Sequence, residues 1–144
     1  MYLLDTNILS EIVKRHPDGN VVGRFDGASD ENLFTSAICL EEIHFGINTS
    51  PDGEAVRQRM EGKVLHRMTV VALDEEVARV AGELRGEWKL RGTPVNYRDG
   101  LIAATAKAGG LILVTRNVRH FDHVAGLQIE NWFEAPAGPS SPPN

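Results

Sequence analysis

Short apolar runs alternate with longer amphipathic segments along most of the chain. Four runs, at residues 2–5, 33–35, 69–73 and 111–114, have the length and composition of β-strands. The last of them, Leu111-Ile112-Leu113-Val114, has no polar position at all, which predicts a strand buried on both faces. Each run is separated from the next by a segment long enough to hold a helix.

The spacing of apolar residues between these runs predicts helices. The first covers residues 6–14, and the second begins after Ser36, which can cap it, and carries Leu40, Ile43 and Ile47 on one face. Residues 53–68 are helical in pattern but highly charged, so we expect this segment at the periphery. A stripe of Val77, Ala81, Leu84 and Trp88 predicts a helix after Asp74, and residues 99–108 predict an alanine-rich helix that ends at two glycines.

Strands that alternate with helices predict an α/β fold, with a parallel sheet covered by helices on both faces. The 144 residues, 42% of them hydrophobic, are enough for one domain with a sizeable core. We assign this domain to residues 1–133. The remaining residues, 134–144, are rich in proline and serine, and we expect them to form a disordered tail.

Composition excludes several classes of protein. The single cysteine, Cys39, rules out an intramolecular disulfide, and its apolar neighbours favour a small buried side chain over a nucleophile. No apolar run approaches the roughly 20 residues that a membrane-spanning helix needs, and no secretory signal opens the chain. We therefore expect a cytosolic protein.

Charge is distributed unevenly around a net value of −5. Residues 57–119 carry twelve Lys and Arg against seven Asp and Glu, whereas residues 1–56 carry three bases and ten acids. The basic middle of the chain could form a rim that faces phosphates. It could equally fold into solvated faces on which both signs of charge are mixed.

Four acidic or amide positions lie beside the predicted core elements. Asp5 follows the first strand, Glu42 is on the second helix, Asp99 begins the alanine-rich helix, and Asn117 follows the last strand. Because binding sites of parallel sheets gather beyond the carboxyl ends of the strands, these side chains can converge. Carboxylates that converge near a core repel one another unless a cation lies between them, and oxygen ligands suit Mg²⁺ or Mn²⁺. Such an ion can activate water and stabilise charge on a phosphodiester.

Each position also has a simpler explanation. Asp5 can be a helix cap, Glu42 a solvated helix residue, Asp99 a complement to a helix N-terminus, and Asn117 a turn residue. The combination favours a metal site, because all four explanations would have to hold independently in one short chain. His120 and His123 are spaced like a zinc-binding pair, but no third ligand is evident.

The set of motifs resembles the PIN domain, and most closely the VapC-type toxins of bacterial toxin–antitoxin pairs. The resemblance covers roughly residues 1–133 and rests on four segments, Asp5-Thr6-Asn7, Glu42-Ile43 with Gly46, Asp99 with Ile102-Ala103-Ala104-Thr105-Ala106, and Thr115-Arg116-Asn117 followed by Phe121. It implies a three-layer α/β/α fold and Mg²⁺- or Mn²⁺-dependent cleavage of RNA. It also implies a homodimer and inhibition by a small antitoxin protein.

Carried over by position, the resemblance makes Asp5, Glu42 and Asp99 the metal ligands, with Asn117 near the fourth position of the catalytic set. The chain departs from the family there, because the family often has an acid at the place of Asn117 or at the place of His120. Asp122 follows Phe121 and is a further candidate. The second metal position is therefore open.

Two other functions compete with a ribonuclease toxin. A PIN-like domain with weak catalysis could bind RNA or a partner protein, which the residues at 117 and 120 would favour. A receiver-type phosphoacceptor domain has a similar length, but it needs an acidic pair after the first strand and a lysine after a late one. Here Asp5 is followed by Thr6 and Asn7, and the last strand by Thr115 and Arg116, which speaks against this class.

Overall fold

The computed structural model describes residues 1–93 and 95–136. Its centre is a sheet of five parallel strands in the order β3-β2-β1-β4-β5. The strands are β1 (Tyr2–Leu4), β2 (Leu33–Ser36), β3 (Thr69–Val71), β4 (Ile112–Val114) and β5 (Ile129–Glu130). The α/β class that the sequence predicts is confirmed. Of the tail expected at residues 134–144, residues 137–144 lie outside the described residues.

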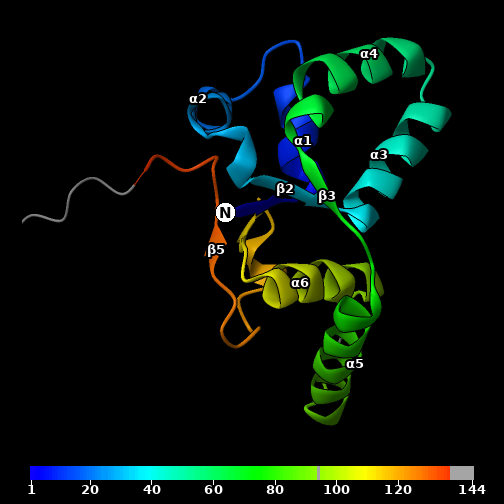
Figure 1. Ribbon diagram of the computed structural model, residues 1–144, viewed down its shortest axis with the longest axis vertical. Helices are drawn as coiled ribbons and strands as arrows, with labels where there is room; N and C mark the ends of the chain where they lie inside the picture. The colour runs from blue at the N-terminus through cyan, green and yellow to red at the C-terminus, as the bar shows by residue number, and fades with distance from the viewer. Residues whose placement is uncertain (94, 137–144) are drawn as a thin grey trace, which may run out of the picture.

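Six α-helices and three short 3₁₀ segments connect the strands. The α-helices are α1 (Thr6–Ile12), α2 (Gly19–Gly27), α3 (Ala37–Thr49), α4 (Gly53–Lys63), α5 (Glu75–Leu90) and α6 (Tyr97–Gly109). The 3₁₀ segments are η1 (Asp30–Asn32), η2 (Leu65–Arg67) and η3 (Val118–His120). Helices α1 to α4 cover one face of the sheet, and α5 and α6 cover the other (Figure 1), so that the domain has three layers.

Two separate clusters of buried side chains hold these layers together. Because neighbouring residues of a strand point to opposite faces, Leu3 belongs to the core under α5 and α6, and Leu4 belongs to the core under α1 to α4. Leu113 and Val114 of β4 divide in the same way. All four side chains are fully buried, as the apolar runs predict.

Several local predictions from the sequence are confirmed. The hydroxyl of Ser36 accepts a hydrogen bond from the backbone N–H of Cys39 (3.0 Å) and caps α3. The predicted apolar stripe of α5 is buried against α6. On α3 the buried stripe is shifted from the predicted one, because Cys39 takes the buried position and Leu40 is only partly buried.

Two elements of the fold do not emerge from the sequence pattern. Helix α2 begins and ends with glycine and contains a third one, Gly23, which lowers its intrinsic helix propensity. It forms because the Asp18 carboxylate caps it and because Val21 and Phe25 enter the core. Strand β5 is only two residues long, too short to show an alternating pattern.

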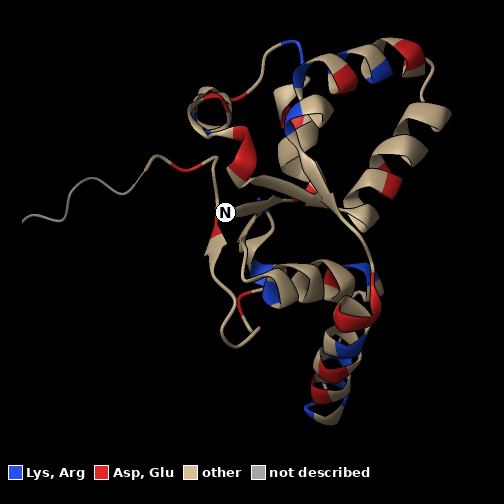
Figure 2. Ribbon diagram, viewed as in Figure 1, with Lys and Arg blue, Asp and Glu red and all other residues tan. Residues whose placement is uncertain are grey.

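Charged residues lie mainly on the surface helices. Figure 2 shows acidic and basic residues interleaved along α4 and α5, which is the mixed distribution that the uneven charge of the sequence left open. Within the described residues, no helix combines the length and the apolar composition needed to cross a bilayer.

Candidate active site

The site lies where the two central strands end. Asp5 follows β1 directly and Thr115 follows β4, and these strands are neighbours in the sheet. The backbone N–H of Asp5 donates to the carbonyl of Val114 (2.9 Å), which joins the two strand ends. Because β2 and β4 lie on opposite sides of β1, the order of the strands reverses at β1. Such a switch point opens a crevice beyond the carboxyl ends of the strands.

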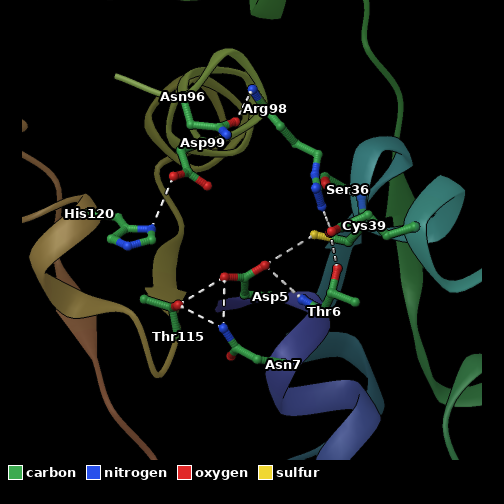
Figure 3. A network of polar contacts seen from close by, with 11 residues as sticks. Asp5, Thr6, Asn7, Ser36, Cys39, Asn96, Arg98, Asp99, Thr115 and His120 are labelled. Atoms are coloured by element: carbon green, nitrogen blue, oxygen red, sulfur yellow. Dashed lines mark hydrogen bonds and ion pairs between the residues drawn. The ribbon is translucent and has the colours of Figure 1, made fainter. Parts of the chain in front are cut away.

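Four donors hold the carboxylate of Asp5 in place (Figure 3). Oδ1 accepts from the backbone N–H of Thr6 (2.7 Å) and from the thiol of Cys39 (3.7 Å). Oδ2 accepts from the hydroxyl of Thr115 (2.8 Å) and from the side-chain amide of Asn7 (3.3 Å). Asp5 is thus both the cap of α1 and a buried carboxylate, 6% exposed, at the base of the crevice. The two readings of this residue from the sequence are compatible.

Glu42 approaches the same crevice from α3. One carboxylate oxygen accepts from the hydroxyl of Thr6, and the other pairs with the guanidinium of Arg98, at the start of α6. The Glu42 side chain is 20% exposed and that of Arg98 is 43% exposed, so the pair lies at the mouth of the crevice. The sequence gives no indication of this ion pair, because it joins two helices that are far apart along the chain.

Asp99 enters the site from the first turn of α6. Its Oδ2 lies 3.1 Å from Nδ1 of His120. Burial raises the pKa of the Asp99 carboxyl, and the negative charge of Asp5 raises it further, while His120 and Arg98 act in the opposite direction. The raised pKa means that burial and the charge of Asp5 together outweigh the effects of His120 and Arg98 on this carboxyl.

One pocket of about 370 Å³ contains all four residues that the sequence singles out. Asp5, Glu42, Asp99 and Asn117 line it, together with Thr6, Asn7, Asn96, Arg98, Ile102 and His120. Asn117 is exposed, and its backbone N–H donates to the Thr115 hydroxyl (3.1 Å). The expected convergence on one crevice therefore occurs, with Asn117 at its edge.

Cys39 contributes to the site in a way that its apolar neighbours in the sequence do not indicate. The residue is fully buried, as expected. However, Asp5, Cys39 and Glu42 each offer one possible metal-ligand atom, and these three atoms all lie within 4.8 Å of one another. Burial, together with the charge of Asp5, raises the pKa of the thiol, so that it remains protonated and donates to Asp5.

The two histidines do not form a shared metal site within the described residues. His120 is directed to Asp99, whereas Nδ1 of His123 lies 3.8 Å from Asp122 and its ring packs edge-on against Trp88. The Nε2 atom of His123 is buried and has no hydrogen-bond partner among residues 1–93 and 95–136. Asp122 is 60% exposed and does not line the pocket of the four residues.

The donor set of the pocket fits a hard divalent cation. Three carboxylates, of Asp5, Glu42 and Asp99, face one crevice that also offers hydroxyl and amide oxygens. The side chains that this chain itself places beside two of them are the guanidinium of Arg98 and the imidazole of His120, both of them partly exposed to solvent. Carboxylate, hydroxyl and amide oxygens are the ligands that Mg²⁺ and Mn²⁺ prefer.

Comparisons with known proteins agree with this architecture. The model of the PIN domain family matches residues 2–127. The VapC ribonuclease Y4jK of Sinorhizobium fredii is 37% identical, covering 93% of this chain and 99% of its own. The tRNA(fMet)-specific endonuclease VapC of Salmonella typhimurium is 33% identical over 91% of this chain and 97% of its own.

Solved structures with the same fold include toxin–antitoxin complexes. The FitAcB complex of Neisseria gonorrhoeae contains a chain with a TM-score of 0.85 and 30% identity, which covers 94% of this chain and 100% of that one. VapBC2 of Rickettsia felis, bound to a DNA fragment from its promoter, gives a TM-score of 0.82 at 30% identity, covering 91% and 98%. This chain belongs to the PIN domain family.

Proposed function

We propose that this chain is a divalent-metal-dependent endoribonuclease that acts as the toxin of a type II toxin–antitoxin module. The observation that carries the proposal is the meeting of Asp5, Glu42 and Asp99 in one pocket, at the strand ends of a PIN-family domain. Relatives at 30–37% identity that are named as ribonucleases or endonucleases support it. The nuclease domain would span residues 1–133.

In this proposal, Asp5, Glu42 and Asp99 hold Mg²⁺ or Mn²⁺, with Asn117 at the edge of the catalytic set. When bound, such an ion lowers the pKa of a water molecule and stabilises charge on the phosphodiester during an in-line displacement. The hydrogen bonds from Thr6, Thr115 and Asn7 fix the Asp5 carboxylate before substrate arrives. A preorganised ligand does not have to be ordered during the reaction.

Glu42 and Asp99 would share their carboxylates between the metal and groups that already contact them. The Glu42 carboxylate pairs with the guanidinium of Arg98, and Oδ2 of Asp99 faces His120. Arg98 and His120 both line the pocket, so the guanidinium and the imidazole N–H remain available to a phosphate that enters it. Binding of metal and binding of substrate would therefore be coupled through these two side chains.

A small antitoxin is the proposed protein partner, and the assembly would contain a homodimer of this chain. Solved complexes of similar proteins, such as FitAcB and VapBC2, support this partner class. The Arg98–Glu42 pair indicates how inhibition could work, because it places a guanidinium among these carboxylates. An antitoxin whose C-terminal segment presents an arginine or lysine to the pocket would displace the metal. Inhibition by an antitoxin that lacks this segment should then be incomplete; full inhibition would contradict this mechanism.

A direct experiment is to incubate the purified protein with a panel of RNAs that includes tRNA, in Mg²⁺, in Mn²⁺ and with chelator. We expect cleavage products only with metal, and none from an Asp5→Asn variant. The runner-up function is a PIN-like domain with weak catalysis that binds RNA or protein, which the neutral Asn117 and the imidazole of His120 favour. Retention of RNA without cleavage in any metal would support that function instead.

A further inference from the structure

His120 lies where three pockets meet. It lines the acidic pocket, a second pocket of about 310 Å³ that also contains Asn96 and Arg119, and a third of about 340 Å³ that also contains Arg116 and Arg119. The second pocket shares Asn96 and Asp99 with the acidic one, and the third shares Asn117 with it. The acidic pocket therefore continues on two sides, and the path to each side passes His120.

The charge of the two flanking pockets differs from that of the acidic one. The acidic pocket has three carboxylates, whereas the third pocket is lined by two arginines and one glutamate, Glu134. Arg119 lines both flanking pockets and forms part of the boundary between them. In the second pocket Arg119 is balanced by Asp99, so a polyanion excluded by the bare carboxylates would meet an excess of positive charge in the third pocket, beside them.

The two arginines are held differently. The guanidinium of Arg116 lies 4.5 Å from the centre of the Phe133 ring, and its backbone N–H donates to Asn7 (3.1 Å), so its position is fixed by the fold. Arg119 is exposed, and across residues 1–93 and 95–136 no carboxylate lies within 4.0 Å of its side-chain nitrogens. Five of the ten other arginines in the same part of the chain are engaged in ion pairs, namely Arg24, Arg57, Arg67, Arg79 and Arg98.

We propose that Arg119 is a substrate-binding residue that contacts a backbone phosphate of single-stranded RNA next to the phosphate that is cleaved. The strand would occupy the acidic pocket and continue into a flanking pocket past His120. A guanidinium can bind two phosphate oxygens at once, and flanking pockets of about 310 and 340 Å³ are within the range for small-ligand sites. This inference rests on the proposed ribonuclease function and adds a residue outside the carboxylate set.

The test measures binding separately from cleavage. In an Asp99→Asn background, which should not cleave, the affinity for a fluorescent single-stranded RNA is measured across a range of salt concentrations. We expect Arg119→Ala to weaken binding about tenfold, the loss of one hydrogen bond between charged groups. The slope of log K against log salt should fall by about 0.7, which corresponds to one phosphate contact on a single strand.

Two matched variants make the result specific. Arg119→Lys keeps the charge but cannot bind two phosphate oxygens at once. Its affinity for the RNA should therefore lie between those of Arg119→Ala and the Asp99→Asn background. Arg15→Ala removes another exposed arginine, which follows α1 at the end of that helix remote from Asp5, and should leave both affinity and salt slope unchanged. An effect of Arg119→Ala no larger than that of Arg15→Ala would overturn the proposal, provided that both variants melt like the parent.

Kinetics in the active protein distinguish this inference from the proposed function. Arg119→Ala should raise KM about tenfold and leave kcat nearly unchanged, because the contact is to a part of the substrate that does not react. Cleavage by the parent with no effect of Arg119→Ala would reject the role of Arg119 alone. Failure of the parent to bind or cleave any RNA would reject both. Weaker binding of the antitoxin, with RNA binding unchanged, would assign Arg119 to the protein interface instead and overturn its role in RNA binding.

Discussion

Nδ1 of His120 lies 3.1 Å from Oδ2 of Asp99, so an imidazole ring occupies the place beside this carboxylate. This relationship has two consequences. In the absence of metal, His120 offsets part of the negative charge that faces Asp99. When one metal is bound, the imidazole of His120 supplies no negative charge to a second hard cation, so any second metal should bind weakly.

Replacing His120 by aspartate should reverse both effects. His120→Asp places a carboxylate beside Asp99, so we expect a lower melting temperature in metal-free buffer and a tighter second Mn²⁺ site. Calorimetric titration with Mn²⁺ measures the second effect. Asp122→Asn is the matched control, since that side chain is 60% exposed and lies outside the acidic pocket. Two tight sites in the parent, one of them lost in Asp122→Asn, would show that Asp122 is the fourth carboxylate.

Removing Arg98 should strengthen metal binding. The guanidinium competes with a cation for Glu42, and the apparent affinity for metal is reduced by the fraction of molecules in which this pair is formed. We expect Arg98→Ala to tighten Mn²⁺ binding by about fivefold, and Arg98→Lys to have a smaller effect. Calorimetry on the three proteins provides the comparison. Weaker Mn²⁺ binding by Arg98→Ala would mean that Arg98 supports the site and does not compete for it.

The variants Asp5→Asn and Asp99→Asn should differ in stability, although both should lose cleavage. The raised pKa of Asp99 means that its ionised form is disfavoured in the folded protein, so Asp99→Asn should raise the melting temperature in metal-free buffer near neutral pH. Asp5→Asn should lower the melting temperature and cost about 1–2 kcal/mol of unfolding free energy, because the carboxylate accepts hydrogen bonds from Thr6, Thr115 and Asn7. Equal melting temperatures for the two variants would contradict this description of the site.

Glu11 gives the fold a pH dependence that is independent of the site. A hydrogen bond from Lys14 lowers the pKa of the Glu11 carboxyl, and the backbone N–H of Asp18 acts in the same direction against burial. A lowered folded-state pKa stabilises the protein above the ordinary value of 4.5, and this contribution disappears as the pH falls through the folded-state pKa.

Glu11→Gln should therefore cost about 1–2 kcal/mol of unfolding free energy near neutral pH. The cost should shrink in acid, where the parent loses the charge as well. Urea denaturation of the parent and of Glu11→Gln, at neutral pH and in acid, measures the difference in unfolding free energy. A cost that is the same in acid as at neutral pH would show that the contribution comes from packing and not from the charge.

The sequence predicts most of the sheet and the site, for physical reasons that are visible in particular residues. The buried strands around Leu3 and Leu113 can be predicted from their own apolar residues, and the cap at Ser36 involves only neighbouring residues of the chain. Helix α2 escapes prediction because Phe25, held in the tertiary core, outweighs three glycines. The position of Asp5 at the base of the crevice follows from the end of β1, whereas Glu42 and Asp99 reach the crevice from α3 and α6.

The neighbours of those carboxylates could not be predicted in the same way. The Arg98–Glu42 pair joins α6 to α3, and the contact of the Cys39 thiol with Asp5 depends on how α3 crosses the end of β1. Such contacts depend on distances between elements that no local pattern encodes. Thr115 is the exception, because its place directly after the last predicted strand already puts it beside Asp5.

The central claim is that the three carboxylates support metal-dependent cleavage of RNA. The most direct test is a single-turnover assay in which parent and Asp99→Asn act on the best-cleaved RNA over a range of Mn²⁺ concentrations and in chelator. We predict a rate for the parent that saturates with Mn²⁺ and vanishes in chelator, and a rate for Asp99→Asn that is at least about 100-fold lower. Cleavage by the parent at the same rate in chelator, or by Asp99→Asn at the parent's rate, would contradict the claim.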